Sequence, residues 1–193
     1  MIRPIVATSL GIALIVETLV IVALGVSARW PDHRVWPPGR RDWRLWFYWG
    51  SVGVVAVSLP IVAVLTATIR VEAARSWIAI ATILSGLAVA GWAARTLRVA
   101  TSAGLAADLH TDGPYQYSRN PQLVGFALAL TGLAVLIDSR PFTAGLGPTV
   151  VWLWLLPRAE EPWLETEFGD AYRTYCESVP RFVGVRSIRR LLE

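Results

Sequence analysis

Two polar, aromatic-rich motifs near the end of the chain have the residue types of a ligand site. The first is Gly-Pro-Tyr-Gln-Tyr-Ser-Arg-Asn-Pro at residues 113–121. The second begins at Glu160-Glu161 and continues with Phe-Gly-Asp-Ala-Tyr-Arg-Thr-Tyr at residues 168–175 and Val-Pro-Arg-Phe at residues 179–182. Carboxylates and guanidinium groups bind charged partners, and tyrosine rings stack on heterocycles. Because an apolar segment separates the two motifs, this layout indicates a cofactor site at a membrane surface.

The first motif has the sequence of a helix start at Asn120-Pro121, because Asn is a favoured N-cap and Pro suits the first helical position. The backbone N–H groups that follow attract a carboxylate or phosphate, and Arg119 can pair with the same anion. Tyr115 and Tyr117 can offer rings and hydroxyls to an adenine or a ribose. A plain capped membrane helix, with Arg119 and the tyrosines as interfacial anchors, explains the same residues.

The second motif places two carboxylates, Glu160 and Glu161, just after an apolar stretch. A carboxylate pair at a membrane boundary is costly without a partner, and the candidates are Arg119, Arg158 or the cationic centre of a ligand. A solvated acidic helix start is the alternative interpretation. Since the residue before a proline disfavours helix, the sequence predicts that the chain breaks at Glu161 and restarts at Pro162.

Residues 162–179 are predicted to form an amphipathic helix that packs over the cytoplasmic ends of the membrane spans. Gly169 interrupts this segment and marks either a bend or a close contact. The apolar positions recur at helical spacing: Leu164, Phe168, Tyr172, Tyr175 and Val179.

The composition is that of a membrane protein with several spans. Of 193 residues, 54% are hydrophobic and 17% are charged, against about 25% charged in a typical soluble domain. The fold class expected is therefore all-α, with about five transmembrane helices and the C-terminal amphipathic helix on the cytoplasmic side. One membrane domain is expected over residues 1–193, with N-terminal spans in 1–99 and the motifs, a helical hairpin and the cap in 100–193. The five apolar stretches are residues 5–26, 45–69, 77–94, 121–137 and 141–156.

Arginine placement predicts the orientation, because loops on the cytoplasmic side carry the excess of positive charge. Arginines are abundant in the first loop, in the third loop and in the C-terminal tail, whereas the alternate connections hold only Arg70, Arg75 and Arg140. The N-terminus is therefore expected outside and the tail in the cytoplasm. The hairpin formed by the last two spans would bring Asn120 and Glu160 to the same face. The arginines on the expected cytoplasmic side are Arg29, Arg34, Arg40, Arg41, Arg44, Arg95, Arg98, Arg119, Arg158, Arg173, Arg181, Arg186, Arg189 and Arg190.

Other classes of site find little support in the sequence. The arginines lie in short loops between apolar segments, which indicates contact with lipid headgroups and not with nucleic acid. Cys176 is the only cysteine and the two histidines are scattered, so no metal site and no disulfide is expected. Glu17 lies inside the first span and is either functional or paired with a Ser, Thr or Arg of another helix. The tryptophans around the first loop form an aromatic belt or a lipid entrance: Trp30, Trp36, Trp43, Trp46 and Trp49.

Together these motifs resemble the isoprenylcysteine carboxyl methyltransferase and phospholipid methyltransferase superfamily of integral membrane enzymes. The resemblance covers about residues 105–183 and implies a methyltransferase that uses S-adenosylmethionine without a Rossmann domain. Many members have His at the position of Asn120 and Tyr at that of Leu123, and some have Arg at that of Leu156, for which Arg158 is the nearest substitute. The resemblance implies these cofactor contacts: Tyr115, Arg119, Asn120, Pro121, Glu160, Glu161, Tyr172 and Tyr175.

The function expected is methyl transfer to a lipophilic acceptor that enters from the bilayer at the cytoplasmic face. Glu160 and Arg158 are the candidate catalytic residues, and no metal is required. A prenylated cysteine carboxylate, a phospholipid amine and a small isoprenoid all remain open as acceptors. A composition rich in Arg and free of Lys is typical of a GC-rich bacterium, which favours the small lipophilic acceptor. The rival functions are an NADPH-dependent enzyme like the membrane sterol reductases, and a lipid-binding protein without catalysis. The sequence does not indicate an oligomeric state.

Overall fold

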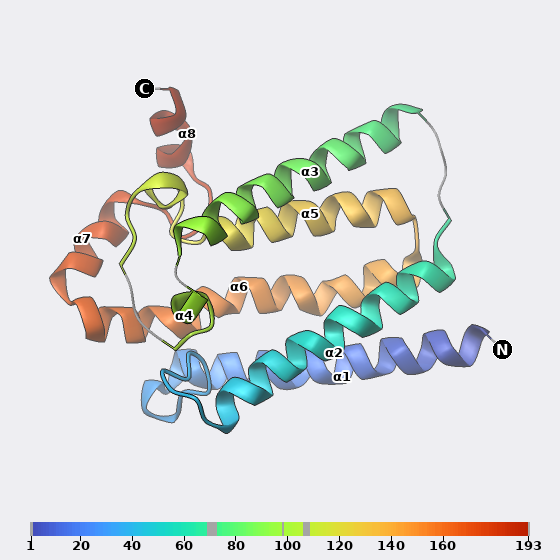
Figure 1. Ribbon diagram of the computed structural model, residues 1–193, viewed down its shortest axis with the longest axis horizontal. Coiled ribbons are helices and arrows are strands. Elements are labelled where there is room, and N and C mark those ends of the chain that lie inside the picture. The colour runs from blue at the N-terminus through green and yellow to red at the C-terminus, as the bar shows by residue number, and fades with distance from the viewer. Residues whose placement is uncertain (1, 69–72, 98, 106–108, 193) are drawn as a thin grey trace.

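Long helices that run along one axis make up most of this protein (Figure 1). The structure is a computed structural model, and it describes residues 2–68, 73–97, 99–105 and 109–192. Every regular element in these ranges is a helix, which confirms the all-helical prediction. The elements are α1 (Ile2–Arg29), η1 (Pro31–His33), α2 (Trp43–Thr66), α3 (Ala73–Thr96), α4 (Val99–Ser102), η2 (Gly113–Gln116), α5 (Pro121–Ile137), α6 (Arg140–Phe168), α7 (Asp170–Ser178) and α8 (Val185–Leu192).

Three helices in the described ranges are long and apolar enough to cross a membrane: Ile2–Arg29, Trp43–Thr66 and Ala74–Thr96. The apolar helix Pro121–Ile137 matches its predicted range but is shorter than these three. α6 is long enough, but its second half is charged. The end of the second predicted span at Ile69, and the loop arginines Arg70 and Arg98, lie outside the described residues.

Helix α6 runs through three prolines, so the predicted break at Glu161-Pro162 is wrong. Pro148, Pro157 and Pro162 all lie inside the helix. A proline costs the helix one backbone hydrogen bond and strains the preceding turn. Here Ala159 and Trp163 are buried on the two sides of that step, and their packing against the rest of the protein holds the helical path. The bend comes at Gly169 instead, where a φ of 52° ends α6 and turns the chain into α7.

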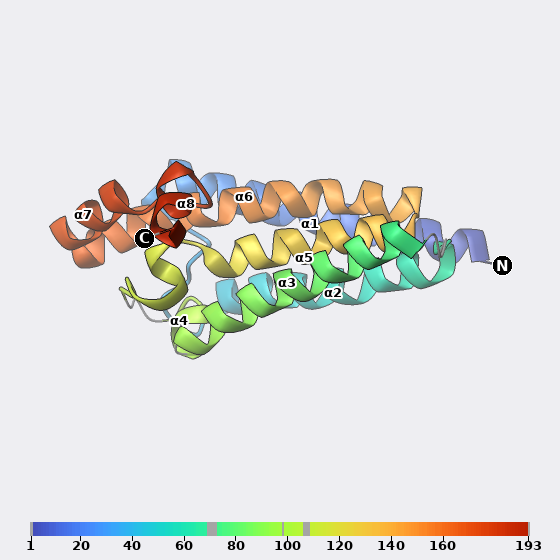
Figure 2. The same cartoon turned by 90° about the horizontal axis from the view of Figure 1, so that it is seen from above.

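The helices associate in two groups, with α3 packed along α5 and α1 packed along both α2 and α6 (Figures 1 and 2). Small residues allow the first pair to approach closely. A Cβ atom built on Gly86 would lie 2.5 Å from the backbone nitrogen of Ala129, and one on Gly125 would lie 2.5 Å from the backbone nitrogen of Ala90. Close backbone contact of this kind is how membrane helices associate, because lipid supplies no hydrophobic force between them.

Helices α5 and α6 are joined by the turn at Asp138 and Ser139, where Asp138 has a φ of 47°. The Ser139 hydroxyl accepts the Phe142 N–H at 3.2 Å and so caps α6. The two helices then run back along each other, but each packs mainly against a different neighbour. The start of α5 and the second half of α6 therefore reach the same end of the molecule, together with α7 and α8, as the hairpin prediction requires (Figure 1).

The contact between α3 and α5 gives a stability prediction. Gly125→Ala places a methyl group against the α3 backbone and should destabilise the protein by roughly 1 to 3 kcal/mol. The control is Gly91→Ala, also on α3, where an added Cβ meets no atom within 4 Å. Because alanine is the better helix former, this control should be neutral or stabilising. Thermal unfolding in detergent measures both variants, and equal midpoints would contradict the close packing.

Candidate functional site

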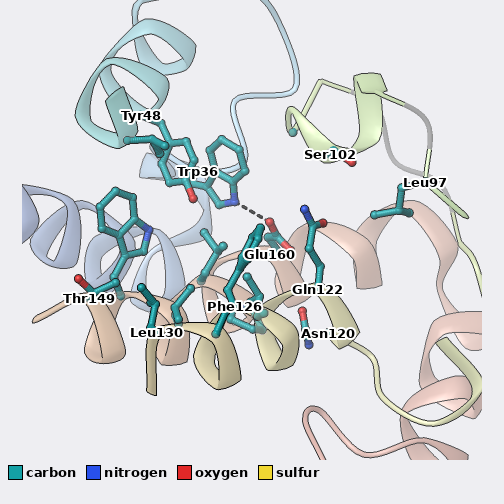
Figure 3. Close-up of a pocket in the computed structure, with 18 of the residues that line it drawn as sticks. Trp36, Tyr48, Leu97, Ser102, Asn120, Gln122, Phe126, Leu130, Thr149 and Glu160 are labelled. Carbon is teal, nitrogen blue, oxygen red and sulfur yellow. Dashed lines mark hydrogen bonds between the residues drawn. The ribbon is translucent and has the colours of Figure 1, made fainter. Parts of the chain in front are cut away.

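A cavity of about 790 Å³ opens between α2, α5 and α6 and continues to the loops at the end that carries α7 (Figure 3). Its deeper part is apolar, with walls that include Leu59, Leu133, Phe142 and Leu146. Its other end carries the polar side chains of both sequence motifs. Such a shape suits a ligand that has one charged end and one lipophilic end.

Nearly all the predicted site residues line this cavity. The structure brings them together from η2, the start of α5, the second half of α6 and α7. Pro121 is buried at the first position of α5 and is not part of the lining. Tyr117 faces Trp92 of α3, with ring centroids 6.5 Å apart. The predicted residues in the lining are Tyr115, Arg119, Asn120, Glu160, Glu161, Tyr172 and Tyr175.

The two adjacent glutamates have different surroundings, which their sequence does not reveal. Glu161 accepts from Arg119 Nη1 at 2.9 Å and from Arg181 Nε and Nη2 at 2.7 and 2.5 Å. Both of its oxygens are therefore occupied by guanidinium groups. Because one carboxylate faces two guanidiniums, the cluster keeps an excess of positive charge beside the start of α5. Arg119 is a predicted partner of the glutamates, whereas Arg181 was not predicted.

Glu160 is bound by a residue from the first loop. The indole Nε1 of Trp36 donates to Glu160 Oε1 at 2.6 Å (Figure 3). The other oxygen, Oε2, makes no hydrogen bond with the described residues. Burial raises the pKa of Glu160 from 4.5 to about 7; the hydrogen bond from Trp36 opposes this rise and the nearby charge of Glu161 adds to it. Near neutral pH this carboxyl can hold or release a proton.

Arg119 is held in place by α7 and by the segment that follows α7, as well as by Glu161. Its Nη1 donates to Cys176 Sγ at 2.7 Å, and its backbone N–H donates to Pro180 O at 2.9 Å. Its Nε is buried and has no hydrogen-bond partner among the described residues. Since an unsatisfied buried donor is costly, this nitrogen is an available contact for an acceptor atom in the cavity.

Asn120 begins α5 as predicted, but its side chain does not cap the helix. Its Nδ2 instead donates to the carbonyl of Arg181 at 2.9 Å, and its backbone N–H donates to Ser118 Oγ at 3.1 Å. The Asn120 side chain therefore binds the C-terminal tail and does not cap the helix. The N–H groups of Gln122 and Leu123 in the first turn are left without intrahelical partners, and both residues line the cavity.

The cap helix α7 covers the polar end with two buried tyrosines. The Tyr175 hydroxyl donates to the carbonyl of Tyr115 at 2.7 Å and so links α7 to η2. Tyr172 packs beside Tyr175, with ring centroids 6.4 Å apart. Burial raises the pKa of all three tyrosines, Tyr115, Tyr172 and Tyr175, so they remain neutral hydroxyls.

Arg158, the other candidate catalytic residue, lies outside the cavity lining. Its guanidinium stacks on the ring of Trp154 at 3.4 Å, and its Nη1 donates to the Trp154 carbonyl at 2.5 Å. Arg158 lies two positions after Leu156, the position where some family members carry an arginine, and on a helix these two positions point about 200° apart.

Trp36, Tyr48 and Trp152 line the cavity but were not predicted as site residues. Trp36 was grouped with the other tryptophans of the first loop, yet it is 3% exposed whereas Trp46 is 71% exposed. The belt interpretation therefore does not describe Trp36. The Pro37-Pro38 pair that follows Trp36 is the one local feature that sets it apart from the other tryptophans.

Glu17, the carboxyl in the middle of α1, is fully buried and accepts a hydrogen bond from the Thr149 hydroxyl of α6. Its second oxygen is buried without a partner among the described residues. Glu17 is not in the cavity lining, although Thr149 is. The predicted Thr partner on another helix is thus present.

Comparison with known proteins agrees with the motifs. Residues 74–171 match the phospholipid methyltransferase family, and the chain belongs to that family. A similar curated protein is the protein-S-isoprenylcysteine O-methyltransferase of Schizosaccharomyces pombe, which is 38% identical over 74 residues. That alignment covers 37% of this chain and 31% of the relative, so it spans about a third of the relative's length. No solved structure matches this chain. With its apolar helices, this protein is therefore a membrane protein of a methyltransferase family.

The raised pKa of Glu160 predicts how stability depends on pH. An acid whose folded pKa exceeds its unfolded value contributes stability that is lost as pH rises from 4.5 through about 7. Glu160→Gln removes this contribution, so the unfolding temperature of the variant should rise relative to wild type between pH 5 and pH 8. The control Glu165→Gln, at an exposed position on the same helix, should follow wild type. Parallel profiles for wild type and Glu160→Gln would contradict the assignment.

Proposed function

We propose that this protein transfers the methyl group of S-adenosylmethionine to a lipophilic acceptor at the cytoplasmic face of the membrane. The observation that carries the proposal is the cavity, in which the polar residues of both family motifs gather at one end of an apolar chamber. Membership of the phospholipid methyltransferase family supports the reaction class. The protein-S-isoprenylcysteine O-methyltransferase relative supports a lipid-linked acceptor.

The residues at the polar end fit the donor groups of such a cofactor. The free N–H groups at the start of α5, the unpartnered Nε of Arg119 and the excess positive charge beside Glu161 suit a carboxylate. The open Oε2 of Glu160 suits an amino group or a ribose hydroxyl. The rings of Tyr115, Tyr172 and Tyr175 suit adenosine.

This arrangement can catalyse methyl transfer mainly by positioning the reactants and excluding water. When bound, the cofactor supplies a methyl group that its sulfonium already activates. The cap helix α7 and the aromatic wall shield the polar end, while the apolar walls hold the acceptor's lipophilic part. If the acceptor is an amine, its proton must leave, and Glu160 can take it because its pKa is about 7. A carboxylate acceptor releases no proton and needs no base.

The acceptor must carry a group near Glu160 and a lipophilic part that reaches toward Phe142 and Leu146. A prenylated cysteine carboxylate, a phospholipid amine and a small isoprenoid all meet this requirement, and we favour the small isoprenoid. Incubating bacterial lipid extracts with the protein and isotope-labelled S-adenosylmethionine, followed by mass spectrometry, identifies the product. A labelled lipid in the wild-type reaction that is missing with Glu160→Gln would name the acceptor.

We further propose that α5 and the first part of α6 cross the membrane, so that residues 1–193 form one domain of five spans in the bacterial cytoplasmic membrane. The connections at the end that carries α7 hold most of the described arginines, which supports a cytoplasmic location for that end. In a Cys176→Ser background, Leu192→Cys should react with a membrane-impermeant maleimide only after cells are opened, and Ile2→Cys should react in intact cells. The reverse pattern would refute this orientation.

Cofactor binding tests the proposed function directly. The purified protein should bind S-adenosylhomocysteine in calorimetric titration, and Glu160→Gln and Arg119→Ala should each weaken binding by about tenfold or more, since each removes a charged hydrogen-bond partner. Glu165→Gln, which is exposed and pairs with Arg173, should bind like wild type. Unchanged affinity in both site variants would remove this assignment. Thermal stabilisation by NADPH instead would favour a reductase, and stabilisation by neither would favour a lipid-binding protein.

A further inference from the structure

The first loop contributes an unassigned residue to the polar end of the cavity. Trp36 lies between α1 and α2. It is far along the chain from both sequence motifs and outside the matched region 74–171. Its indole N–H donates to Glu160 Oε1 at 2.6 Å. Trp36 therefore donates a hydrogen bond to one oxygen of Glu160, and the other oxygen, Oε2, stays available.

The backbone around Trp36 is anchored by a buried serine. Ser27, in the last turn of α1, accepts the N–H groups of Val35 and Trp36 at 2.9 and 3.1 Å. Arg44, in the first turn of α2, donates to the carbonyls of Arg34 and Pro38 on either side of Trp36, at 3.0 and 3.1 Å. The loop is therefore tied to the ends of both helices that it joins.

The ring of Trp36 is fixed from two sides. It stacks on Tyr48 of α2 with ring centroids 3.7 Å apart and an interplanar angle of 27°. Gly104 lies against the edge of the six-membered ring, where an added Cβ would come within 2.8 Å of Trp36 Cη2. Gly104 is itself joined to the loop, because its carbonyl accepts the Gly39 N–H at 2.9 Å. The bound backbone, the stacking on Tyr48 and the contact with Gly104 hold the ring so that its indole N–H points toward Glu160.

We propose that Trp36 is a positioning residue: it fixes one oxygen of Glu160 so that the other, Oε2, is presented to a ligand in the cavity. The identity of that ligand rests on the proposed function, but the constraint on Glu160 does not. A tryptophan donor also favours the ionised form of the carboxyl over the neutral form. Trp36 therefore sets both the direction and the protonation of this glutamate.

The other charged and titratable groups near Glu160 do not replace this donor. Glu161 follows it on α6 and is bound by Arg119 from the α5 start and Arg181 from the tail. Tyr115 from η2 has its pKa raised mainly by burial, and the charge of Glu160 adds to that rise. Tyr48 from α2 lines the same cavity. His110 belongs to the same cavity wall. Among the described residues, the hydrogen bond on Glu160 comes from Trp36.

Trp36→Phe tests the proposal, because it keeps an aromatic ring for Tyr48 and removes the N–H. The carboxyl band of Glu160 is followed by infrared difference spectroscopy across pH in the protein without ligand, and is assigned by its loss in Glu160→Gln. The titration midpoint should rise by about one pH unit in Trp36→Phe, which is the effect expected when one hydrogen bond to the charged form is lost. Affinity for S-adenosylhomocysteine at pH 7.5 should fall by about tenfold.

The matched control is Trp46→Phe, the same substitution at a tryptophan that is 71% exposed and outside the cavity lining. It should leave the midpoint and the affinity at wild-type values. If Trp36→Phe does not fold, Ser27→Ala loosens the same loop, and its midpoint should rise in the same direction by a smaller amount. An unchanged midpoint in a folded Trp36→Phe or Ser27→Ala protein would overturn the proposal.

The two proposals fail in distinguishable ways. The infrared titration needs no ligand, so a protein that binds no S-adenosylhomocysteine can still show the shift in Trp36→Phe. That result would reject the cofactor and keep the positioning role. Normal binding by wild type, with an unchanged midpoint in Trp36→Phe, would keep the cofactor and reject the positioning role.

Discussion

The polar end of this protein depends on one carboxylate, that of Glu161. It binds Arg119 at the start of α5 and Arg181 in the tail, and so joins three segments of the chain at one point. The Arg119 backbone and the Asn120 side chain reinforce the join through the carbonyls of Pro180 and Arg181. Removing either arginine would leave a partly buried charge uncompensated, so the cluster needs both partners in place. The cluster holds α7 and the tail over the cavity, and neither arginine binds Glu160.

The adjacent glutamates therefore have different roles, although the sequence motif presents them as one pair. Consecutive residues on a helix point about 100° apart, so one side chain of the pair can face the tail while the other faces the first loop. Glu161 is occupied by cations and holds the structure together. Glu160 has a neutral donor on one oxygen and an open second oxygen, and burial brings its pKa close to neutral.

Local residue types predicted the helices and the meeting of the two motifs well. Asn120-Pro121 marks the start of α5, and the apolar segments after it return the chain to the same end, so Arg119 and Glu161 meet as expected. The side-chain contacts of Asn120, Arg158 and Arg181 could not be predicted, because they depend on where the tail and the helix turns lie in space. The path of α6 through Pro162 was missed for a related reason: local propensity disfavours it and tertiary burial of Trp163 outweighs that preference.

The continuous α6 has a mechanical consequence. A helix that bent at Glu161 could move its last turns independently of its first part. As one rod from Arg140 to Phe168, α6 instead carries the glutamates at a fixed height above the apolar chamber. The opposite wall of that chamber comes from α2, which lies outside the matched region. Substitutions on α2 can therefore change the depth and width of the chamber, while the position of Glu160 depends on α6 and on the hydrogen bond from Trp36.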